Sequence, residues 1–464
     1  MPFSPESMAS TDAVSPDQIV RSGLCIGCGA CAGTNEAARM RMDAYGQFKP
    51  EGPSAWRRER SPQFSRLCPF SPSARNETQL AEERFSAAAG QDARIGRFEA
   101  AYVGAVAESD FRDQGSSGGL VSWVAAELLR RGLVDGVAHV APVTPRKDGA
   151  FFGYRVSRSA AEVRQGAKSR YYPVELSGVL RQIREVPGRY ALVGIPCFIK
   201  AVHLLRRQEP VLAERIVFTL GLFCGHMKSA RMIESFGWQM GGAVADIERF
   251  EFRLKDPARP ANWYTAQLTR KDGSTGQKAW WDMADGDWGA GFFQNSACNF
   301  CDDVAAETAD IAFGDAWVEP YSSDPRGTNV VVVRSPILHG IVTEAMTAGR
   351  LDLDPVDADF VVETQAAGFR QRREGLAYRL TWWRSGVRPL KRVPPGAAGL
   401  PLRRRLIYRM RAGISAWSHR MFRLARSLHW PGLYIGWARA SLSLYQGLAY
   451  SRGRVGRLLD RFLN

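Results

Sequence analysis

The sequence predicts a mixed α/β (α+β) protein, with a small cysteine-rich module before an α/β body and a basic helical tail after it. Strand-like and helix-like hydrophobic patterns alternate from residue 101 to residue 348, which indicates a sheet covered by helices. Four of the eight cysteines precede residue 70, and the C-terminal segment is rich in arginine. With 464 residues, 45% of them hydrophobic, the chain is long enough for about three domains.

The body is expected to open with a buried strand at 101–107 and a helix at 120–131. Further strands are predicted at 136–140, 190–193, 215–223 and 329–333, and further helices at 175–184, 198–207, 229–240 and 338–348. Between residues 247 and 281, alternating residues and a turn at 271–274 predict antiparallel strands. This order predicts an open sheet with covering helices.

The N-terminus carries no sign of a targeting segment. Its first 17 residues are polar and lack an apolar core, so no secretory signal is predicted. No apolar stretch reaches the length needed to span a bilayer. We therefore expect a cytoplasmic protein, where thiols stay reduced and eight cysteines are better explained as ligands than as disulfides.

The most informative motif is a C-x-x-C-x-x-C run formed by Cys25, Cys28 and Cys31, to which Cys68 and Pro69 add a distant fourth thiol. Four thiolates at this spacing are typical of a cubane (4Fe-4S) iron–sulfur cluster in a ferredoxin-like module. A zinc site is the main alternative, but zinc sites usually pair two C-x-x-C knuckles and do not need the third closely spaced cysteine. The motif therefore indicates electron transfer.

The other four cysteines are Cys197, Cys224, Cys298 and Cys301. Cys197 and Cys224 directly follow predicted strands, where open α/β sheets place their ligands, and Cys298 and Cys301 form a knuckle. Together they predict a second 4Fe-4S cluster. The alternative is two buried core thiols and a zinc knuckle without partners.

Two loops suit a flavin dinucleotide. The run 114–119, which contains Ser116, Ser117, Gly118 and Gly119, lies between a strand and a helix, where backbone amides and the helix N-terminus favour phosphate. The run 165–172 adds two cations, a hydroxyl and two aromatic rings, with Lys168, Ser169, Arg170 and Tyr171 as candidate FAD contacts. The alternatives are a plain capped turn and a solvated basic loop.

Together these motifs resemble, in order, those of the coenzyme F420 hydrogenase/dehydrogenase beta subunit family, whose relatives include 7-hydroxymethyl chlorophyll a reductase. The resemblance runs from about Ile19 to Arg392. Its parts are the run 22–31, then 67–69, 116–119, 134–136, 169–171, 194–197, 298–302, 309–311, 314–315 and Gly327. It implies a flavoprotein with FAD and one or two 4Fe-4S clusters, in which Cys25, Cys28, Cys31 and Cys68 hold the first cluster and Cys197, Cys224, Cys298 and Cys301 the second.

The resemblance also suggests how the chain is divided. We expect a disordered N-terminus (1–20), a ferredoxin-like 4Fe-4S module (21–72), a linker with some helix (73–98), and a basic amphipathic helical tail (396–464). Between them lie a segment of the family's N-terminal type (99–185) and one of its C-terminal type (186–395).

Two positions depart from the family pattern. Arg170 stands where many relatives have Lys, which keeps the charge but changes its geometry. Phe198 stands where a Gln is common, so a polar contact is lost. A proton donor is also needed beside the acceptor, and the candidate catalytic residues are His226, Asp302 and Asp315, with a structural role as the alternative for each.

The tail carries the excess of positive over negative charge in this chain. From Arg370 to Asn464 there are 21 Lys and Arg residues against two acids, whereas the rest of the chain has 41 against 45. Apolar residues recur at helical spacing at Leu406, Met410, Ile414, Trp417, Met421, Leu424 and Leu428. A basic amphipathic helix suits an anionic membrane surface, such as the inner face of the cell membrane; the alternatives are packing on the body and, less favoured, nucleic-acid binding.

The sequence thus favours an iron–sulfur flavoprotein oxidoreductase. Electrons would pass from a ferredoxin-like donor through 4Fe-4S clusters to FAD and on to an organic small-molecule acceptor. The alternatives are a subunit that reduces or oxidises F420 itself, a non-catalytic electron-relay subunit, and a zinc-stabilised binding protein.

Overall fold

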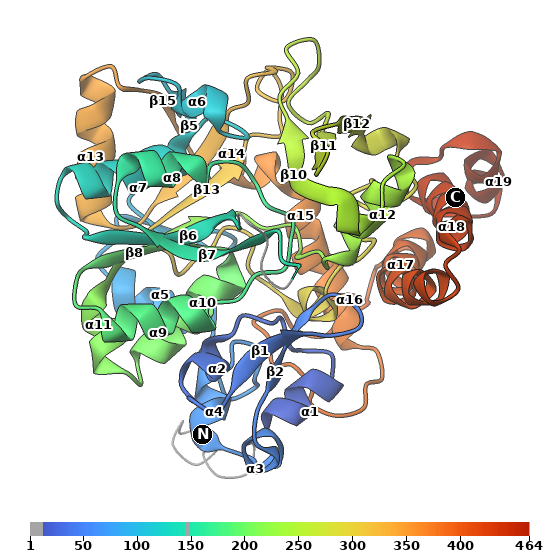
Figure 1. Ribbon diagram of the computed structural model, residues 1–464, viewed down its shortest axis with the longest axis horizontal. Coiled ribbons are helices and arrows are strands. Elements are labelled where there is room, and N and C mark those ends of the chain that lie inside the picture. Colours follow the sequence, from blue (N-terminus) through green and yellow to red (C-terminus); the bar gives the residue numbers. More distant parts are fainter. Residues whose placement is uncertain (1–12, 144–148, 464) are drawn as a thin grey trace.

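The computed structural model describes residues 13–143 and 149–463, and it is built around one eight-stranded mixed sheet (Figure 1). The strand order is β15-β5-β14-β13-β9-β8-β6-β7. In chain order the strands are β5 (Ala100–Val106), β6 (Gly136–Pro142), β7 (Phe152–Ser157), β8 (Tyr190–Gly194), β9 (Ile216–Leu222), β13 (Ile311–Asp315), β14 (Asn329–Val333) and β15 (Leu351–Val356). The α/β prediction is confirmed, although β7, β13 and β15 were not foreseen.

The central strands are buried on both faces, and their side chains alternate between two cores. In β8, Ala191 and Val193 face one core while Tyr190 and Leu192 face the other. The first core is closed by α7 (Leu120–Arg130), α8 (Ala160–Gln165) and α13 (Pro336–Thr347). The second is closed by α9 (Ser177–Glu185), α10 (Pro196–Arg206) and α11 (Pro210–Arg215).

The two predicted segments of the body share this sheet. Strand β5, from the first segment, lies between β14 and β15, both from the second, and is antiparallel to each. Tyr102 pairs with Val331 on one side and with Pro355 on the other. The segments therefore form one structural unit rather than two separate domains.

The N-terminal module lies below the sheet in Figure 1 and contributes to the same core as α9 and α10. It contains α1 (Pro16–Arg21), α2 (Ala30–Gly33), the hairpin β1 (Arg39–Met42) and β2 (Phe48–Glu51), α3 (Ser54–Arg58) and α4 (Pro62–Leu67). The prediction of disorder for 1–20 is wrong from residue 13 onward, because Ser15 caps α1 in a capping box with Gln18. Residues 1–12 lie outside the described residues.

The predicted linker also has regular structure, namely α5 (Glu77–Phe85) and the hairpin of β3 (Gly90–Asp92) and β4 (Gly96–Phe98). Short elements connect the rest: α6 (Phe111–Gln114), α12 (Arg231–Gln239), α14 (Ala358–Thr364), α15 (Ala366–Arg372) and α16 (Glu374–Leu380), with single 3-10 turns at Val244–Asp246, Trp280–Asp282 and Ser296–Phe300. The region predicted as antiparallel strands forms a separate three-stranded sheet of β10 (Ile247–Leu254), β11 (Thr265–Arg270) and β12 (Thr275–Ala279).

The tail forms three helices, α17 (Leu402–Ser427), α18 (Pro431–Tyr450) and α19 (Gly453–Leu463), at the right of Figure 1. The buried face of α17 includes Tyr408, Ile414, Phe422 and Ala425; the last three, with Tyr434 of α18, join the core of the three-stranded sheet. The buried face of α17 also includes Ser415, Ser418 and His419. It is therefore turned around the helix axis by about one residue from the predicted apolar stripe.

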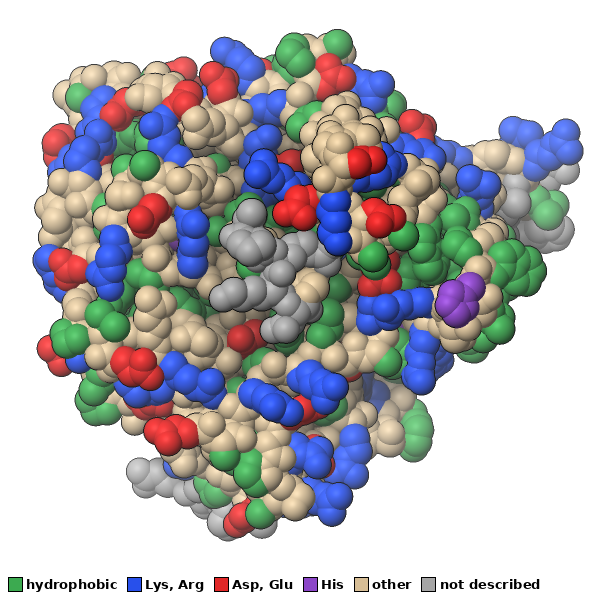
Figure 2. Space-filling model, in the orientation of Figure 1, with side chains coloured by type: hydrophobic (Ala, Val, Ile, Leu, Met, Phe, Trp, Pro, Cys, Tyr) green, Lys and Arg blue, Asp and Glu red, His purple; other side chains and the backbone are tan. Residues whose placement is uncertain are grey.

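The rotation leaves part of the predicted stripe exposed. Trp417, Leu424 and Leu428 lie on the surface of α17, and hydrophobic side chains gather over the C-terminal helices among basic ones in Figure 2. The helix therefore packs on the body and still carries an apolar row, for which membrane contact stays a prediction. None of the helices in the described part of the chain is long and apolar enough to cross a membrane.

Truncating Phe422 should loosen the tail from the body. Phe422 is 1% exposed and stacks on Trp238 with ring centroids 4.4 Å apart. We expect Phe422→Ala to lower the free energy of unfolding by about 3–5 kcal/mol in denaturant titrations. Trp417→Ala, on the 51% exposed side of the same helix, should change it by less than about 0.5 kcal/mol. Equal effects of the two substitutions would contradict this packing.

The same interface should weaken in acid. Burial lowers the pKa of His419, which contacts the carbonyl oxygen of Gln294, to about 4. Between pH 6.5 and about 4 the unfolded chain binds a proton that the folded chain does not, so this residue makes stability fall as the pH falls, by at most about 3 kcal/mol. His419→Gln should remove this part of the pH dependence of the free energy of unfolding, whereas a substitution of the exposed His429, His429→Gln, should leave it unchanged.

Candidate functional site

A large cavity opens at one edge of the eight-stranded sheet. Strands β6, β8, β9 and β13 are parallel, and β5 has the same direction because it and β13 are both antiparallel to β14. Their carboxyl ends therefore meet at this edge, where open α/β sheets place ligands. The cavity has a volume of about 790 Å³, which is in the upper part of the range of ligand and cofactor sites.

The two loops predicted to bind a flavin meet on its wall. The Ser169 amide donates a hydrogen bond to the Ser116 hydroxyl over 2.8 Å, and Ser117 donates to the carbonyl oxygen of Thr328, also over 2.8 Å. Ser116, Ser117, Gly119, Lys168, Ser169, Arg170 and Tyr171 all line the cavity. The structure thus brings both loops together at the start of α7.

Gly118 has a different role from its neighbours. It does not line the cavity, and a Cβ atom there would lie 2.8 Å from the carbonyl oxygen of Gly104 and 2.8 Å from the Asn329 side chain. The loop therefore needs this glycine to pack against β5 and β14. Gly119 begins α7 at φ 85°, and Lys168 adopts φ 88°, which is unusual for a residue with a Cβ atom and is typical of functional loops.

Arg170 and Tyr171 are held by the protein itself. The Arg170 guanidinium pairs with Glu251 at 2.8 Å and lies 4.9 Å from the centre of the Phe152 ring. Tyr171 packs against Trp288, with ring centroids 4.8 Å apart. Among the residues predicted to contact FAD, Arg170 therefore has the side chain that is least free to move toward a ligand.

The four cysteines of the first set lie together in a buried site. Burial, reinforced by neighbouring sulfurs of the set, raises the pKa of Cys28 and of Cys31 far above the usual range and that of Cys68 to about 12. The neighbours that act on Cys31 are Cys28, Cys25 and Cys68. A cluster of thiols with raised pKa values fits a cationic iron core, because metal coordination deprotonates a thiol outright.

The second set has the same character. Burial and then Cys301, Cys224 and Cys298 raise the pKa of Cys197 far above its usual range, and Cys28 of the first set adds to the effect. The backbone amide of Met227 donates to the Cys298 sulfur over 3.3 Å. The two sets are therefore neighbours, each suited to four-thiol ligation.

Tyr154 lies between the two sets and the cavity. Its pKa is raised by burial and by both Cys197 and Cys28, and its hydroxyl donates to the carbonyl oxygen of Val193 over 2.9 Å. Its ring stacks on Phe198, the residue that departs from the family pattern.

Among the described residues, no group of three or more His, Cys, Asp or Glu side chains has the geometry to hold a single metal ion.

The cavity and the second set share a wall. Cys224 and Cys298 both line the cavity, together with His226 and Lys228. A ligand in the cavity can thus reach van der Waals distance of two sulfur ligands of the second set. The predicted flavin site and the predicted second cluster site, which the sequence indicated separately, therefore adjoin at this wall.

The three candidate proton donors have different surroundings. His226 lines the cavity and stacks on Trp288 with ring centroids 4.3 Å apart. Asp315 also lines the cavity, where Arg253 pairs with it at 2.9 Å. Asp302 does not line the cavity: despite its burial, Lys391 and Arg392 hold its pKa well below the usual range, so it has no proton to donate at neutral pH. The structure therefore gives Asp302 a structural role.

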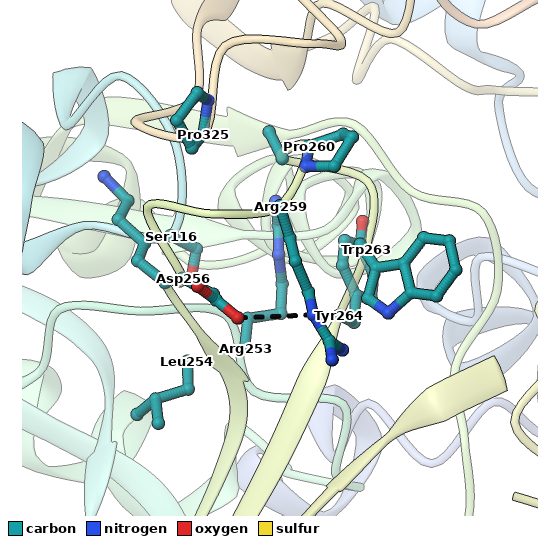
Figure 3. Close-up of a pocket in the computed structure, with 11 residues that line it drawn as sticks. Ser116, Arg253, Leu254, Asp256, Arg259, Pro260, Trp263, Tyr264 and Pro325 are labelled. Carbon is teal, nitrogen blue, oxygen red and sulfur yellow. Dashed lines mark ion pairs between the residues drawn. The ribbon is translucent and has the colours of Figure 1, made fainter. Parts of the chain in front are cut away.

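A small recess of about 10 Å³ lies next to the large cavity and shares Ser116 and Tyr264 with it (Figure 3). Arg259 pairs with Asp256 at 3.3 Å across it. Arg253 lies 4.3 Å from the centre of the Tyr264 ring and fixes the ring that separates the recess from the cavity. The recess is too small for a ligand of its own.

Several wall residues carried no signal in the sequence. Tyr264 and Trp288 come from loops next to the three-stranded sheet, and Arg411 and Tyr445 come from the tail. None of them belongs to a recognisable motif, because they reach the cavity only through tertiary packing. Only the high aromatic content between residues 263 and 293 could have pointed to this wall.

An α/β sheet with a ligand cavity at its carboxyl edge and eight unpaired thiols, two of them buried and six partly buried, is typical of an oxidoreductase of the cysteine-rich type. The chain belongs to the coenzyme F420 hydrogenase/dehydrogenase beta subunit family. The family's N-terminal model matches residues 101–181 and its C-terminal model matches residues 188–359. The resemblance inferred from the motifs is confirmed, and the family implies FAD and iron–sulfur clusters.

Among solved structures, a chain of the xenon-derivatised F420-reducing NiFe hydrogenase complex from Methanosarcina barkeri is similar. It shares 16% sequence identity over 65% of this chain and 99% of that chain, with a TM-score of 0.49. No curated protein matches the sequence.

Substitutions in the two cysteine sets should remove iron independently. We expect Cys197→Ser to lose about half of the iron bound by the anaerobically purified protein, and Cys68→Ser to lose the other half, because each set is built to hold one cluster. Iron analysis and the electron paramagnetic resonance of the reduced protein measure this. Full iron retention in Cys197→Ser would contradict a second cluster.

Proposed function

We propose that this chain is an iron–sulfur flavoprotein subunit that exchanges electrons between two 4Fe-4S clusters and FAD, with coenzyme F420 as the organic partner of the flavin. Family membership supports the reaction class, and it favours F420 over an unspecified acceptor. The observation that carries the electron route is the shared wall, where the flavin loops and the sulfur ligands Cys224 and Cys298 line one cavity.

Each cofactor has residues that suit it. The first set, Cys25, Cys28, Cys31 and Cys68, would hold one cluster, and the second set, Cys197, Cys224, Cys298 and Cys301, the other. The backbone at Ser116 and Gly119, at the N-terminus of the eleven-residue helix α7, suits the phosphates of FAD, with Lys168 beside it. When bound, the clusters supply one-electron transfer and the flavin links it to two-electron chemistry.

The chain's own residues would shape the site and exclude water from it. Tyr171, Trp280 and Trp288 form one aromatic cluster, which excludes water and offers ring faces for an aromatic ligand. Arg253, paired with Asp315, holds Tyr264 against this cluster. Because Nδ1 of His226 faces the guanidinium of Arg411 at 3.4 Å, and a guanidinium only donates, the proton of a neutral His226 lies on Nε2.

The N-terminal module suits entry of electrons from a partner protein. None of the four cysteines of the first set lines the cavity, whereas Cys224 and Cys298 of the second set do, so the first set is the more distant from the flavin loops. We expect a ferredoxin-like donor, or a companion subunit in its place, to dock at this module. The first set would then receive electrons before the second.

Cys28→Ser tests this route. Loss of one ligand should abolish reduction of the bound flavin by reduced ferredoxin and lower F420 reduction at least a hundredfold, since one-electron entry is lost, while FAD content stays unchanged. Flavin bleaching under anaerobic conditions and F420 absorbance measure it. Thr34→Ser, which keeps the hydroxyl that donates to the Cys31 carbonyl oxygen, is the matched control. Undiminished turnover in a Cys28→Ser protein that lacks the first cluster would rule out the route.

A further inference from the structure

The end of the cavity next to the tail is lined by cations. Lys228, Arg372, Arg379 and Arg411, called here the cationic wall, all line it, and they come from four separate parts of the chain. Lys228 is 2% exposed, and Arg372 and Arg379 are each 4% exposed. Helix α17 supplies Arg411, so the tail completes this wall.

These charges repel one another. Burial and then Arg411 lower the pKa of Arg379 to about 9, and the same two causes lower the pKa of Lys228 to about 7. Burial opposes the charge of Arg372 as well, but its position against Cys301, Cys224 and Cys298 outweighs burial and raises its pKa. Arg372 thus differs from the other three cations in lying against the second cysteine set.

The direct partners of the three other cations are neutral. Lys228 donates to the Phe292 carbonyl oxygen over 2.7 Å. Arg379 donates to the carbonyl oxygens of Asn299 and Gln371 over 2.8 Å and 2.7 Å, and Arg411 donates to the Gln294 side chain over 3.2 Å. None of the three forms an ion pair with a carboxylate in the described part of the chain.

The carboxylates on the cavity wall do not compensate for this charge. Asp315 is paired with Arg253 in another part of the wall, and Glu363 comes from α14. Asp285 and then Asp287 favour the charged form of Lys228, but neither forms an ion pair with it. Asp285 accepts hydrogen bonds from Ser235 and Tyr434, and Asp287 accepts one from Gln446 over 3.1 Å. Arg404, a further cation on the wall, is already paired with Glu374. The tail end of the cavity therefore has a net positive charge.

His226 adds an unpartnered donor to the same place. It is 4% exposed, and its Nε2 has no hydrogen-bond partner among the described residues. With its proton on Nε2, this nitrogen is a donor. A buried donor without a partner costs about 1–3 kcal/mol, which an oxygen atom of a ligand would offset.

We propose that the cationic wall, together with His226, binds a carboxylate or phosphate group of the organic acceptor. This inference rests on the proposed function, since it places the acceptor between the flavin loops and the tail. FAD phosphates have their own site at the α7 N-terminus, so the wall is free for a second anion. Because α17 and α18 lie beyond the family match, which ends at residue 359, this part of the acceptor site belongs to this chain's own tail.

Binding of inorganic phosphate tests the inference. The FAD- and iron-loaded protein is titrated with phosphate at constant ionic strength, with chloride as the balancing salt, and thermal unfolding is followed. We expect a saturable rise in the unfolding midpoint. Arg411→Gln and Arg379→Gln should each weaken the apparent phosphate affinity at least tenfold. Arg420→Gln, on the exposed side of α17, should leave it unchanged.

Three results would overturn the proposal. The first is a wild-type protein that phosphate stabilises no more than chloride does. The second is normal phosphate affinity in Arg411→Gln, or in Arg379→Gln should the first variant not fold. The third is release of FAD as phosphate binds, which would assign the cations to the flavin. A failure of the proposed function can be told apart from these results. In that case the purified protein would lack flavin and iron, whether or not phosphate binds.

Discussion

The gathering of eight thiols into two neighbouring sets near the carboxyl edge of the sheet is the constraint on which the site depends. Burial and neighbouring sulfurs raise the pKa of Cys28 in the first set and of Cys197 in the second, and a cationic core would satisfy such sulfurs because metal coordination deprotonates a thiol. Strands β8 and β9, the 3-10 turn at Ser296–Phe300 and the N-terminal module all converge on this region. The positions of the cavity and of Tyr154 follow from that convergence.

Much of the fold could be predicted because its signals are local. The predicted strands at 101–107, 190–193 and 329–333 are continuous apolar runs, as parallel and central strands require, and each lies within a residue or two of the observed strand. The cysteine sets were visible for the same reason, since ligand spacing and strand-end positions are written in the sequence. Lys168 and Ser116 were found through glycine and serine patterns that mark close backbone approaches.

The rest depends on contacts between distant residues. A spacing rule placed Ile414 and Trp417 on one face of a helix, but it could not tell which neighbouring face meets the body, and the buried face proved to contain Ser418 and Phe422. Asp302 follows a ligand cysteine and so resembled a catalytic acid, yet Lys391, far along the chain, neutralises it. The cationic wall could not be predicted from the sequence, because its members are spread over three helices and a loop.

The interleaving of β5 with β14 and β15 has a consequence for biosynthesis. Tyr102 emerges from the ribosome long before Val331 and Pro355, its partners on either side. Until then the edges of β5 are unpaired, and contacts of such high sequence separation close slowly. The N-terminal module, whose four thiols are complete by residue 68, is made first. During translation the first thiol set is therefore complete well before the second, whose last member is Cys301.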